Sequence, residues 1–177
     1  LAAMFTVETA AEFIKMAAEA DANVASLDAA LKSAGYSGAE YRKTLLEQAD
    51  ALKEKVAVDD DEIIRLQKLV LSFTGNLDVT KQLVPAILDV ARATGISTDA
   101  AARLFARTQE GTEALRRLGI TVGGTVTEEQ RLAKIVEEVT KKYGGQAEAF
   151  AKSDLGKIEQ SKIAWEDFGK SVGRLLS

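Results

Sequence analysis

The feature that most constrains this sequence is a series of helix-stopping glycines, most of them followed closely by helix-starting residues. These glycines end segments whose apolar residues have helical spacing: Gly75, Gly95, Gly119 and Gly144. Residues that favour a helix N-cap follow the first three: Asn76 or Asp78, Ser97 and Thr127. Extended chain is suggested only at 120–126, and one such run cannot build a sheet. The sequence therefore predicts an all-α fold of about seven or eight helices.

The first 57 residues predict a coiled-coil-like helical hairpin. Apolar residues of the first helix alternate in steps of four and three: Phe13, Ala17, Ala20, Val24, Leu27 and Leu31. A short glycine-containing turn at 35–38 precedes a second helix, so the two helices are expected to be antiparallel. The first helix could pack against that neighbour or against another subunit, and we favour the neighbour.

Residues 58–177 predict a compact, irregular multi-helix bundle. The acidic run 59–62 lies where a helix N-terminus attracts negative charge. The following helix, 63–73, is apolar nearly all round, which is typical of a helix buried on several sides. We therefore place this helix at the centre of the fold and expect a boundary near Val58 between hairpin and bundle.

The last helix carries the candidate functional residues. They follow coiled-coil spacing and are here called the C-terminal seam: Ile158, Trp165, Phe168, Val172 and Leu175. This spacing does not decide whether the seam packs within the chain or against a partner helix outside it. Trp165 is expected to be a packing anchor.

Composition excludes several function classes. The chain has no Cys and no His, so it lacks a thiol nucleophile, the usual general base and the commonest metal ligand. Lysines and arginines are interspersed with acidic residues at a net charge of −4, so no nucleic-acid footprint is expected. No apolar run is long enough to span a membrane. We predict no catalytic, cofactor-binding or metal site.

Four residue clusters carry side chains or glycines that chemical sites also use, and each has a simpler explanation. The acidic run 59–62 lacks the ligand spacing of an EF-hand and is better explained as a helix cap in water. Glu137 and Glu138 are expected on a solvated helix face. The glycine pairs at 123–124 and 144–145 lack the phosphate-loop pattern and predict a loop and a helix end. Four arginines are expected near helix C-termini and in ion pairs: Arg103, Arg107, Arg116 and Arg117.

Six phrases occur in a distinctive order along the chain: LSFTG (71–75), ARATG (91–95), RRLGI (116–120), TEEQ (127–130), KKYGG (141–145) and IAWEDFG (163–169). In this order and spacing they resemble the phage and prophage tail length tape-measure proteins. The resemblance covers roughly the last three quarters of the chain and is weakest in the N-terminal hairpin. Since members of that family are usually far longer, it implies that this chain is a fragment.

The resemblance implies a structural, non-enzymatic segment involved in tail assembly and length determination. It also implies a homo-oligomer in the full-length protein, contacts with the tail-tube protein and tail assembly chaperones, and a location in the virion tail, or in the host bacterial cytoplasm during assembly. The alternative is a helical adaptor module that binds a partner and is unrelated to tails.

Overall fold

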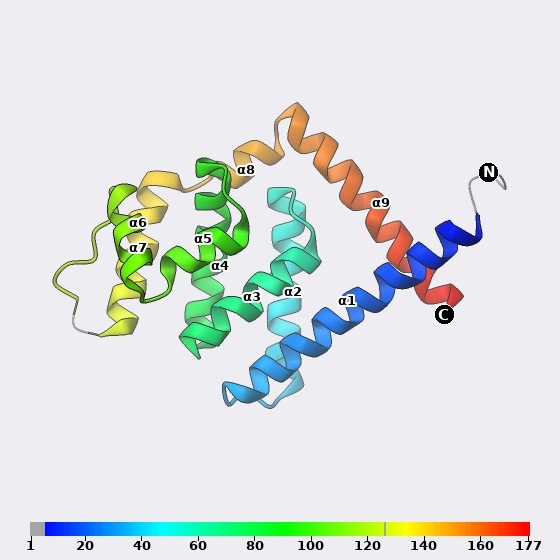
Figure 1. The fold of residues 1–177 in the computed structure, drawn as a ribbon, viewed down its shortest axis with the longest axis horizontal. Coiled ribbons are helices and arrows are strands. Elements are labelled where there is room, and N and C mark those ends of the chain that lie inside the picture. The colour runs from blue at the N-terminus through cyan, green and yellow to red at the C-terminus, as the bar shows by residue number, and fades with distance from the viewer. Residues whose placement is uncertain (1–5, 126) are drawn as a thin grey trace.

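The computed structural model describes residues 6–125 and 127–177, apart from the side chain of residue 109 (Figure 1). Within these ranges the chain is all-α, as predicted, with nine helices and no strand. Residues 120–125 lack strand structure, and position 126 lies outside the described residues. The helices are α1 (Val7–Ser33), α2 (Ala39–Val56), α3 (Asp60–Thr74), α4 (Leu77–Thr94), α5 (Thr98–Phe105), α6 (Gln109–Arg117), α7 (Glu128–Tyr143), α8 (Gln146–Ala151) and α9 (Asp154–Leu176).

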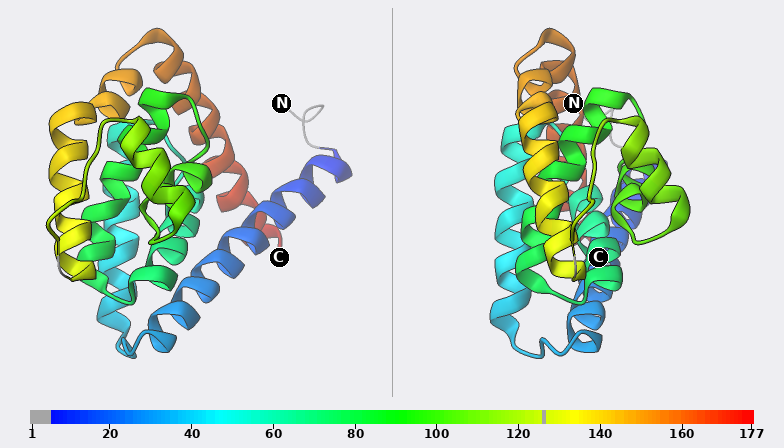
Figure 2. Two further views of the ribbon diagram at one scale, coloured as in Figure 1. Left: turned by 60° about the vertical axis from the view of Figure 1, so that its left-hand side comes forward. Right: turned by 90° about the vertical axis from the view of Figure 1, so that its left-hand side faces the viewer.

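Helices α2 to α8 form the body of the molecule, and α1 and α9 extend from it and cross at one end (Figures 1 and 2). The short α6 and the longer α7 lie at the opposite end. α7 packs on α4, and α8 contacts α2, α4 and α9. Both ends of the described chain therefore lie near the crossing of α1 and α9.

Helix α3 is the centre of the fold, as its all-round apolar sequence predicted. It packs against α1, α2, α4 and α5. Ile63, Leu66 and Val70 are fully buried, and only Arg65 and Ser72 of this helix are exposed. Burying these side chains supplies much of the hydrophobic stabilisation, at roughly 1.5–3 kcal/mol for each large apolar side chain.

One hydrophobic core extends across the boundary expected near Val58. Leu45 and Val56 precede that point and Ile63 follows it, and all three belong to the same buried cluster. The division into 1–57 and 58–177 stays a prediction, but the two parts share a single core.

The first helix has a different main partner from the one expected. Its predicted apolar face is buried within the chain, including Phe13, Leu27 and Leu31. However, α1 packs mainly against α9 and α3 and only slightly against α2, to which a short turn connects it. The expected hairpin is therefore open, because α9 and α3 cover the face that was assigned to α2.

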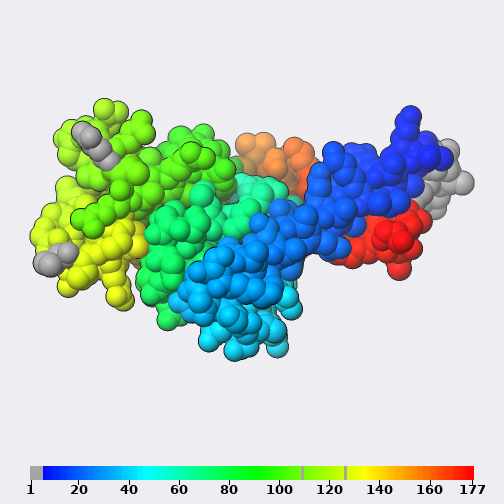
Figure 3. All heavy atoms as spheres, turned by 60° about the horizontal axis from the view of Figure 1, so that its bottom comes forward, coloured from blue at the N-terminus to red at the C-terminus, as the bar shows by residue number. Residues whose placement is uncertain are grey.

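Two glycines allow α9 to approach α1 closely. A Cβ atom at Gly169 would lie 2.8 Å from a ring carbon of Phe13, and one at Gly173 would collide with the Phe13 carbonyl oxygen. Figure 3 shows α1 and the end of α9 side by side on the surface. A side chain at Gly173 would force the backbones apart.

A buried polar network accommodates Pro85 inside α4. Proline has no N–H, so the carbonyl of Lys81 loses its usual helical donor. The Gln48 Nε2 amide donates to that carbonyl at 2.7 Å. Gln67 Nε2 donates in turn to Gln48 Oε1 and to the Leu45 carbonyl, at 3.1 and 2.7 Å. α2 therefore supplies the hydrogen bond that the proline removes from α4.

Most of the predicted helix ends are confirmed. Gly75 and Gly95 end α3 and α4 with positive φ, and the side chains of Asn76, Ser97 and Thr127 cap α4, α5 and α7. Thr6 caps α1, and Gly38 precedes α2. The last helical segment is divided into α8 and α9, and Ser153 caps α9. No helix among the described residues is both long and apolar enough to cross a membrane.

We predict that Gly173→Ala lowers the free energy of unfolding by about 1–3 kcal/mol, because the added methyl group collides with the α1 backbone. At a solvent-exposed position inside a helix, replacing Gly by Ala would instead be stabilising by about 1 kcal/mol. Urea unfolding measures the difference, with Ser171→Ala, an exposed position on α9, as the control. Unchanged or increased stability of Gly173→Ala would show that the two helices do not meet at this point.

Candidate functional site

Helix α9 is held to the rest of the molecule without burying a large apolar side chain of its own. Its buried residues are three glycines and one lysine: Gly156, Gly169, Gly173 and Lys170. It contacts α8 at its beginning and α1 near its end. The attachment of α9 therefore depends on close backbone approach and on charged groups.

The C-terminal seam lies mostly on the surface. Ile158, Phe168 and Leu175 are exposed, Trp165 is 57% exposed, and Val172 is intermediate. Trp165, which was expected to be a packing anchor, packs against the rings of Phe13 and Phe168 but is more than half exposed. Trp165 and Phe168 each contact Phe13 of α1 beside Gly169, and about half of each side chain stays exposed to solvent. The binding of a partner helix by this seam stays a prediction.

An aromatic cluster joins the seam to α1. The ring of Phe13, which is buried, meets the rings of Trp165 and Phe168 edge-on, with centroids 6.0 and 6.1 Å apart. Trp165 and Phe168 are themselves 5.5 Å apart. Phe13 thus supports one side of both rings, while their other sides remain accessible to a partner.

A network of six charged side chains connects α9 to the junction of α2 and α3. We call it the ionic clasp, and its members are Lys53, Asp59, Asp60, Asp61, Asp167 and Lys170. Lys170 Nζ lies 3.1 Å from Asp59, 3.4 Å from Asp60 and 2.5 Å from Asp61. Lys53 Nζ lies 3.0 Å from Asp167 of α9 and 3.8 Å from Asp60.

The acidic run 59–62 was expected to be a helix cap in water, and the structure differs from this expectation in part. Asp59 is at the N-cap position of α3 and the next acidic residues form its first turn, as predicted, but the Asp59 side chain makes no capping hydrogen bond. The run does not lie in open water, however, because Asp61 is 9% exposed and Lys170 is 8% exposed. α9 places an ammonium group where the sequence suggested only solvent.

The clasp changes the acidity of its members. Burial and a hydrogen bond with Asp60 raise the pKa of the Asp59 carboxyl to about 7, against the opposing effect of Lys170. Burial alone would raise the pKa of Asp60, but the hydrogen bond from Asp59 and the charges of Lys170 and Lys53 lower it overall. Burial alone would lower the pKa of Lys170, but Asp61 and Asp59 raise it above its ordinary value. Lys53 behaves in the same way, with Asp167 as its strongest partner.

Three carboxylates of the clasp are close enough to share a metal ion. Oxygens of Asp59, Asp60 and Asp167 lie within 4.8 Å of one another. The ammonium groups of Lys170 and Lys53 already lie among these oxygens and balance part of their charge. The arrangement is thus an ion-pair network, and a cation would compete with both lysines for the same oxygens.

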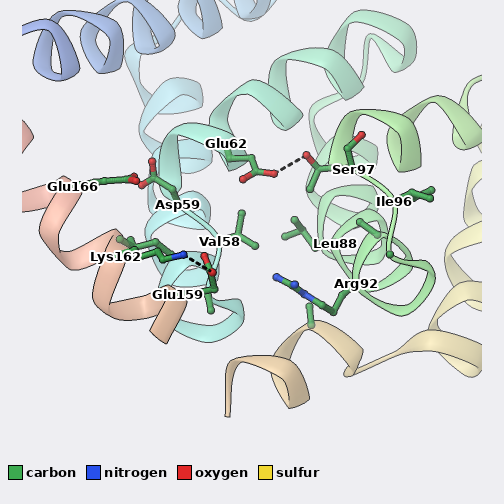
Figure 4. A pocket seen from close by; sticks show the side chains of 16 residues that line it. Val58, Asp59, Glu62, Leu88, Arg92, Ile96, Ser97, Glu159, Lys162 and Glu166 are labelled. Atoms are coloured by element: carbon green, nitrogen blue, oxygen red, sulfur yellow. Dashed lines mark hydrogen bonds and ion pairs between the residues drawn. The ribbon is translucent and has the colours of Figure 1, made fainter. Parts of the chain in front are cut away.

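A pocket of about 390 Å³ lies between α9, the start of α3 and the end of α4 (Figure 4). Leu88 and Val58 supply apolar lining, while Glu62, Arg92 and Glu166 supply charge. Glu62 accepts a hydrogen bond from Thr98 Oγ1 at 2.9 Å. The guanidinium of Arg92 lies 3.6 Å from the centre of the Phe150 ring. The charged groups that line the pocket come from α3, α4 and α9, and they do not converge on one point.

The remaining candidate clusters follow their simpler explanations. Glu137 and Glu138 pair with Lys134 and Lys141 on the outer face of α7. The pair at 123–124 lies in a turn, and Gly144 ends α7. Arg116 and Arg117 pair with Glu113, and Arg107 pairs with Glu128. Arg103 is exposed on α5.

Sequence reasoning missed two features that decide this region. The first is the close contact at Gly169 and Gly173, for which the four-residue spacing of two small residues was an available signal. The second is Lys170, whose aspartate partners at the start of α3 lie more than 100 positions earlier in the chain, so no local pattern identified them.

In comparisons with known proteins, no family model, no curated protein and no solved structure matched this chain.

We predict that Lys170→Met lowers the free energy of unfolding by about 2–4 kcal/mol, because it leaves several partly buried carboxylates without their shared cation. Urea unfolding at neutral pH measures this loss. Lys157→Met is the matched control, because Lys157 is an exposed lysine on the same helix, and it should change stability by less than about 0.5 kcal/mol. Equal stability of the two variants would show that the clasp contributes nothing to folding.

Proposed function

We propose that this chain is a structural, non-enzymatic segment of a phage tail tape-measure protein that contributes to tail assembly and length determination. The proposal starts from the six ordered phrases, which resemble that family. The observation that carries it furthest is the exposed C-terminal seam, part of which lies in the phrase IAWEDFG. An exposed aromatic face at coiled-coil spacing suits a segment that binds another helix during assembly.

In this proposal the chain contributes as a compact module attached to the ruler, and it is not itself extended as part of the ruler. A helix spans about 1.5 Å per residue, so residues 58–177 drawn out as one helix would cover roughly 180 Å. The buried face of α3 opposes such extension, because Ile63, Leu66 and Val70 would become exposed to water. The glycine ends of α3 and α4 oppose it as well.

The proposed partners follow from the family resemblance. They are further copies of the full-length protein, the tail-tube protein and the tail assembly chaperones, in the virion tail or in the bacterial cytoplasm during assembly. The charge pattern supports protein partners over nucleic acid, because Lys141 and Arg116 lie in ion pairs with acidic neighbours on their own helices.

A non-enzymatic role is supported by the surroundings of the carboxylates. Glu137 and Glu138 face solvent beside lysines, which suits a surface ion pair more than acid-base catalysis. Asp59 has a raised pKa, but its nearest partners are the other members of the ionic clasp. The arrangement binds α9 and offers no nucleophile beside a base.

The alternative is a helical adaptor unrelated to tails, which the same seam would serve equally well. The two proposals differ in genomic setting and in what depends on the chain. A tape-measure segment belongs to a very long reading frame among tail genes, whereas an adaptor requires no such setting.

We predict that deleting residues 58–177 from the phage or prophage that encodes this chain abolishes or impairs tail assembly. Electron microscopy of the resulting particles measures tail number and length. Intact, infectious tails shortened by roughly 180 Å, the full helical length, would show that the segment is extended and acts as ruler. Tails of unchanged number and length would contradict the tail role and favour the adaptor.

We also predict that Trp165→Ser combined with Phe168→Ser reduces tail assembly while the purified chain keeps its helical circular dichroism. The expected loss arises because both rings offer apolar surface to a partner. Leu155→Ser is the matched control, since Leu155 is 66% exposed on α9 but lies outside the seam. Normal assembly with the double variant would exclude the seam as a required contact. If the double variant unfolds, Leu175→Ser tests the same face at an 86% exposed position.

A further inference from the structure

We propose that the C-terminal seam binds α1 of a second copy of this chain, so that copies join head to tail. The contact gives the seam a defined partner, and so it rests on that part of the proposed function in which the seam binds another helix. Three observations carry it: a second exposed apolar surface on α1, the sizes of the side chains on the two surfaces, and their opposite charges.

One side of α1 carries apolar residues that are exposed to solvent. We call them the α1 stripe: Val7, Ala11, Ile14, Ala18, Ala22 and Ala25. They follow one another in steps of three and four residues, so they lie on one side of the helix. Figure 3 shows α1 on the surface of the molecule with one side uncovered. At about 1.5 Å per residue the stripe is about 27 Å long, which matches about 26 Å for the seam.

The seam of the same chain cannot reach this stripe. The buried residues of α1 face α9 and α3: Phe13, Ala17, Ala20, Leu27 and Leu31. At about 100° per residue, the stripe lies roughly 140° around the helix from them. Gly169 and Gly173 hold α9 against the buried side. A seam that contacts the stripe must therefore belong to a second molecule.

The two surfaces differ in the size of their side chains. The seam presents large ones, including Trp165, Phe168 and Leu175, whereas four of the six residues of the stripe are alanines. Large side chains of one helix fill the spaces above small side chains of another, which lets the two helices approach closely. Two stripes facing each other would bury only small apolar area, and two seams would have to fit large rings against large rings. Size therefore favours a contact between unlike surfaces.

The exposed charges beside the two surfaces are opposite in sign. Between residues 7 and 25, the exposed charged side chains of α1 are four acidic ones and one lysine: Glu8, Glu12, Glu19, Asp21 and Lys15. From Leu155 onwards, the exposed charged side chains of α9 are all basic: Lys157, Lys162 and Arg174. Seam-to-stripe pairing brings opposite charges together, whereas pairing of like surfaces brings like charges together.

Some of these charges are available for a contact between copies. Lys162 and Arg174 also make ion pairs within the chain. Lys157 and Glu8 make none in the part of the chain that the structure describes, and both are exposed. An ion pair between these two positions of neighbouring copies would therefore cost no existing pair.

A contact between unlike surfaces does not end with two copies. Each copy carries one seam and one stripe, so a pair of copies still has one of each free for the next copy. Such head-to-tail contacts produce an open row, or a ring if the rotation between copies closes. A single pair of helices is a small interface, so the association should be weak and should increase with concentration.

The test uses two variants of the purified chain, each of which lacks one surface. Trp165→Ser with Phe168→Ser removes the seam, and Ala18→Lys with Ala25→Lys places two cations on the stripe, where they meet the basic seam. Sedimentation measures mass against concentration, and circular dichroism checks that each variant is helical. The parent chain should associate beyond the dimer, and each variant alone should stay monomeric. An equal mixture of the two variants should form a complex of one molecule of each that grows no further.

The mixture distinguishes unlike pairing from its alternatives. Dimers of the stripe variant alone would mean that the seam binds itself, and dimers of the seam variant alone would mean that the stripe does. Either result, or a parent chain that stays monomeric at its highest soluble concentration, would overturn the proposal. Ala51→Lys, at an exposed position of α2, is the matched control and should associate like the parent.

Second variants keep the test decisive if a double variant does not fold. Leu175→Ser, at a highly exposed position, then replaces the seam variant, and Ala18→Lys alone replaces the stripe variant. The measurements need no phage, so their outcome is separate from that of the tail experiments. A chain that associates as expected while tails of the seam variant assemble normally would contradict the tail role of the seam, and a monomeric chain with impaired tails would contradict only the pairing of copies.

Discussion

Helix α3 has too little polar surface to be stable in water, and the other helices are arranged around that requirement. Of its 15 residues only Arg65 and Ser72 are exposed, so α1, α2, α4 and α5 must all cover it. Burial also encloses polar groups: Gln48 and Gln67 donate to carbonyl groups near Pro85, whereas the Gln67 Oε1 atom is buried without a hydrogen-bond partner. The resulting core draws on residues from both sides of Val58 and supports the two helices that extend from the body.

The extension of α1 and α9 has a separate physical basis. Gly169 and Gly173 remove side chains from the contact with α1, so the two backbones approach closely around Phe13. The same orientation turns the C-terminal seam outwards and brings Lys170 to the acidic start of α3. The exposed aromatic face and the ionic clasp are therefore two consequences of one helix orientation.

This arrangement gives physical content to the proposed role in tail assembly. A segment that takes part in assembly needs a stable body and an accessible surface, and here α3 anchors the body while α9 carries the surface. α9 is attached through glycines and charges, and it buries no large apolar side chain of its own. The raised pKa of Asp59 would otherwise suggest a catalytic acid, but its neighbours explain the shift as part of an ion-pair network.

The sequence by itself determined where several of the helices begin and end, because those signals act within one or two turns of the chain. Asn76, Ser97 and Thr127 cap the helices they were expected to cap, and the apolar pattern of 63–73 identified the central helix. The tertiary structure alone decided which helix packs against α1 and which residues of α9 are buried. Coiled-coil spacing identifies an apolar face but does not determine which helix packs against it. The ion pair of Lys170 and Asp59 joins residues that are 111 positions apart in the sequence. Such a long-range contact exists only because the packing around α3 and the glycines of α9 bring the two ends of the chain together.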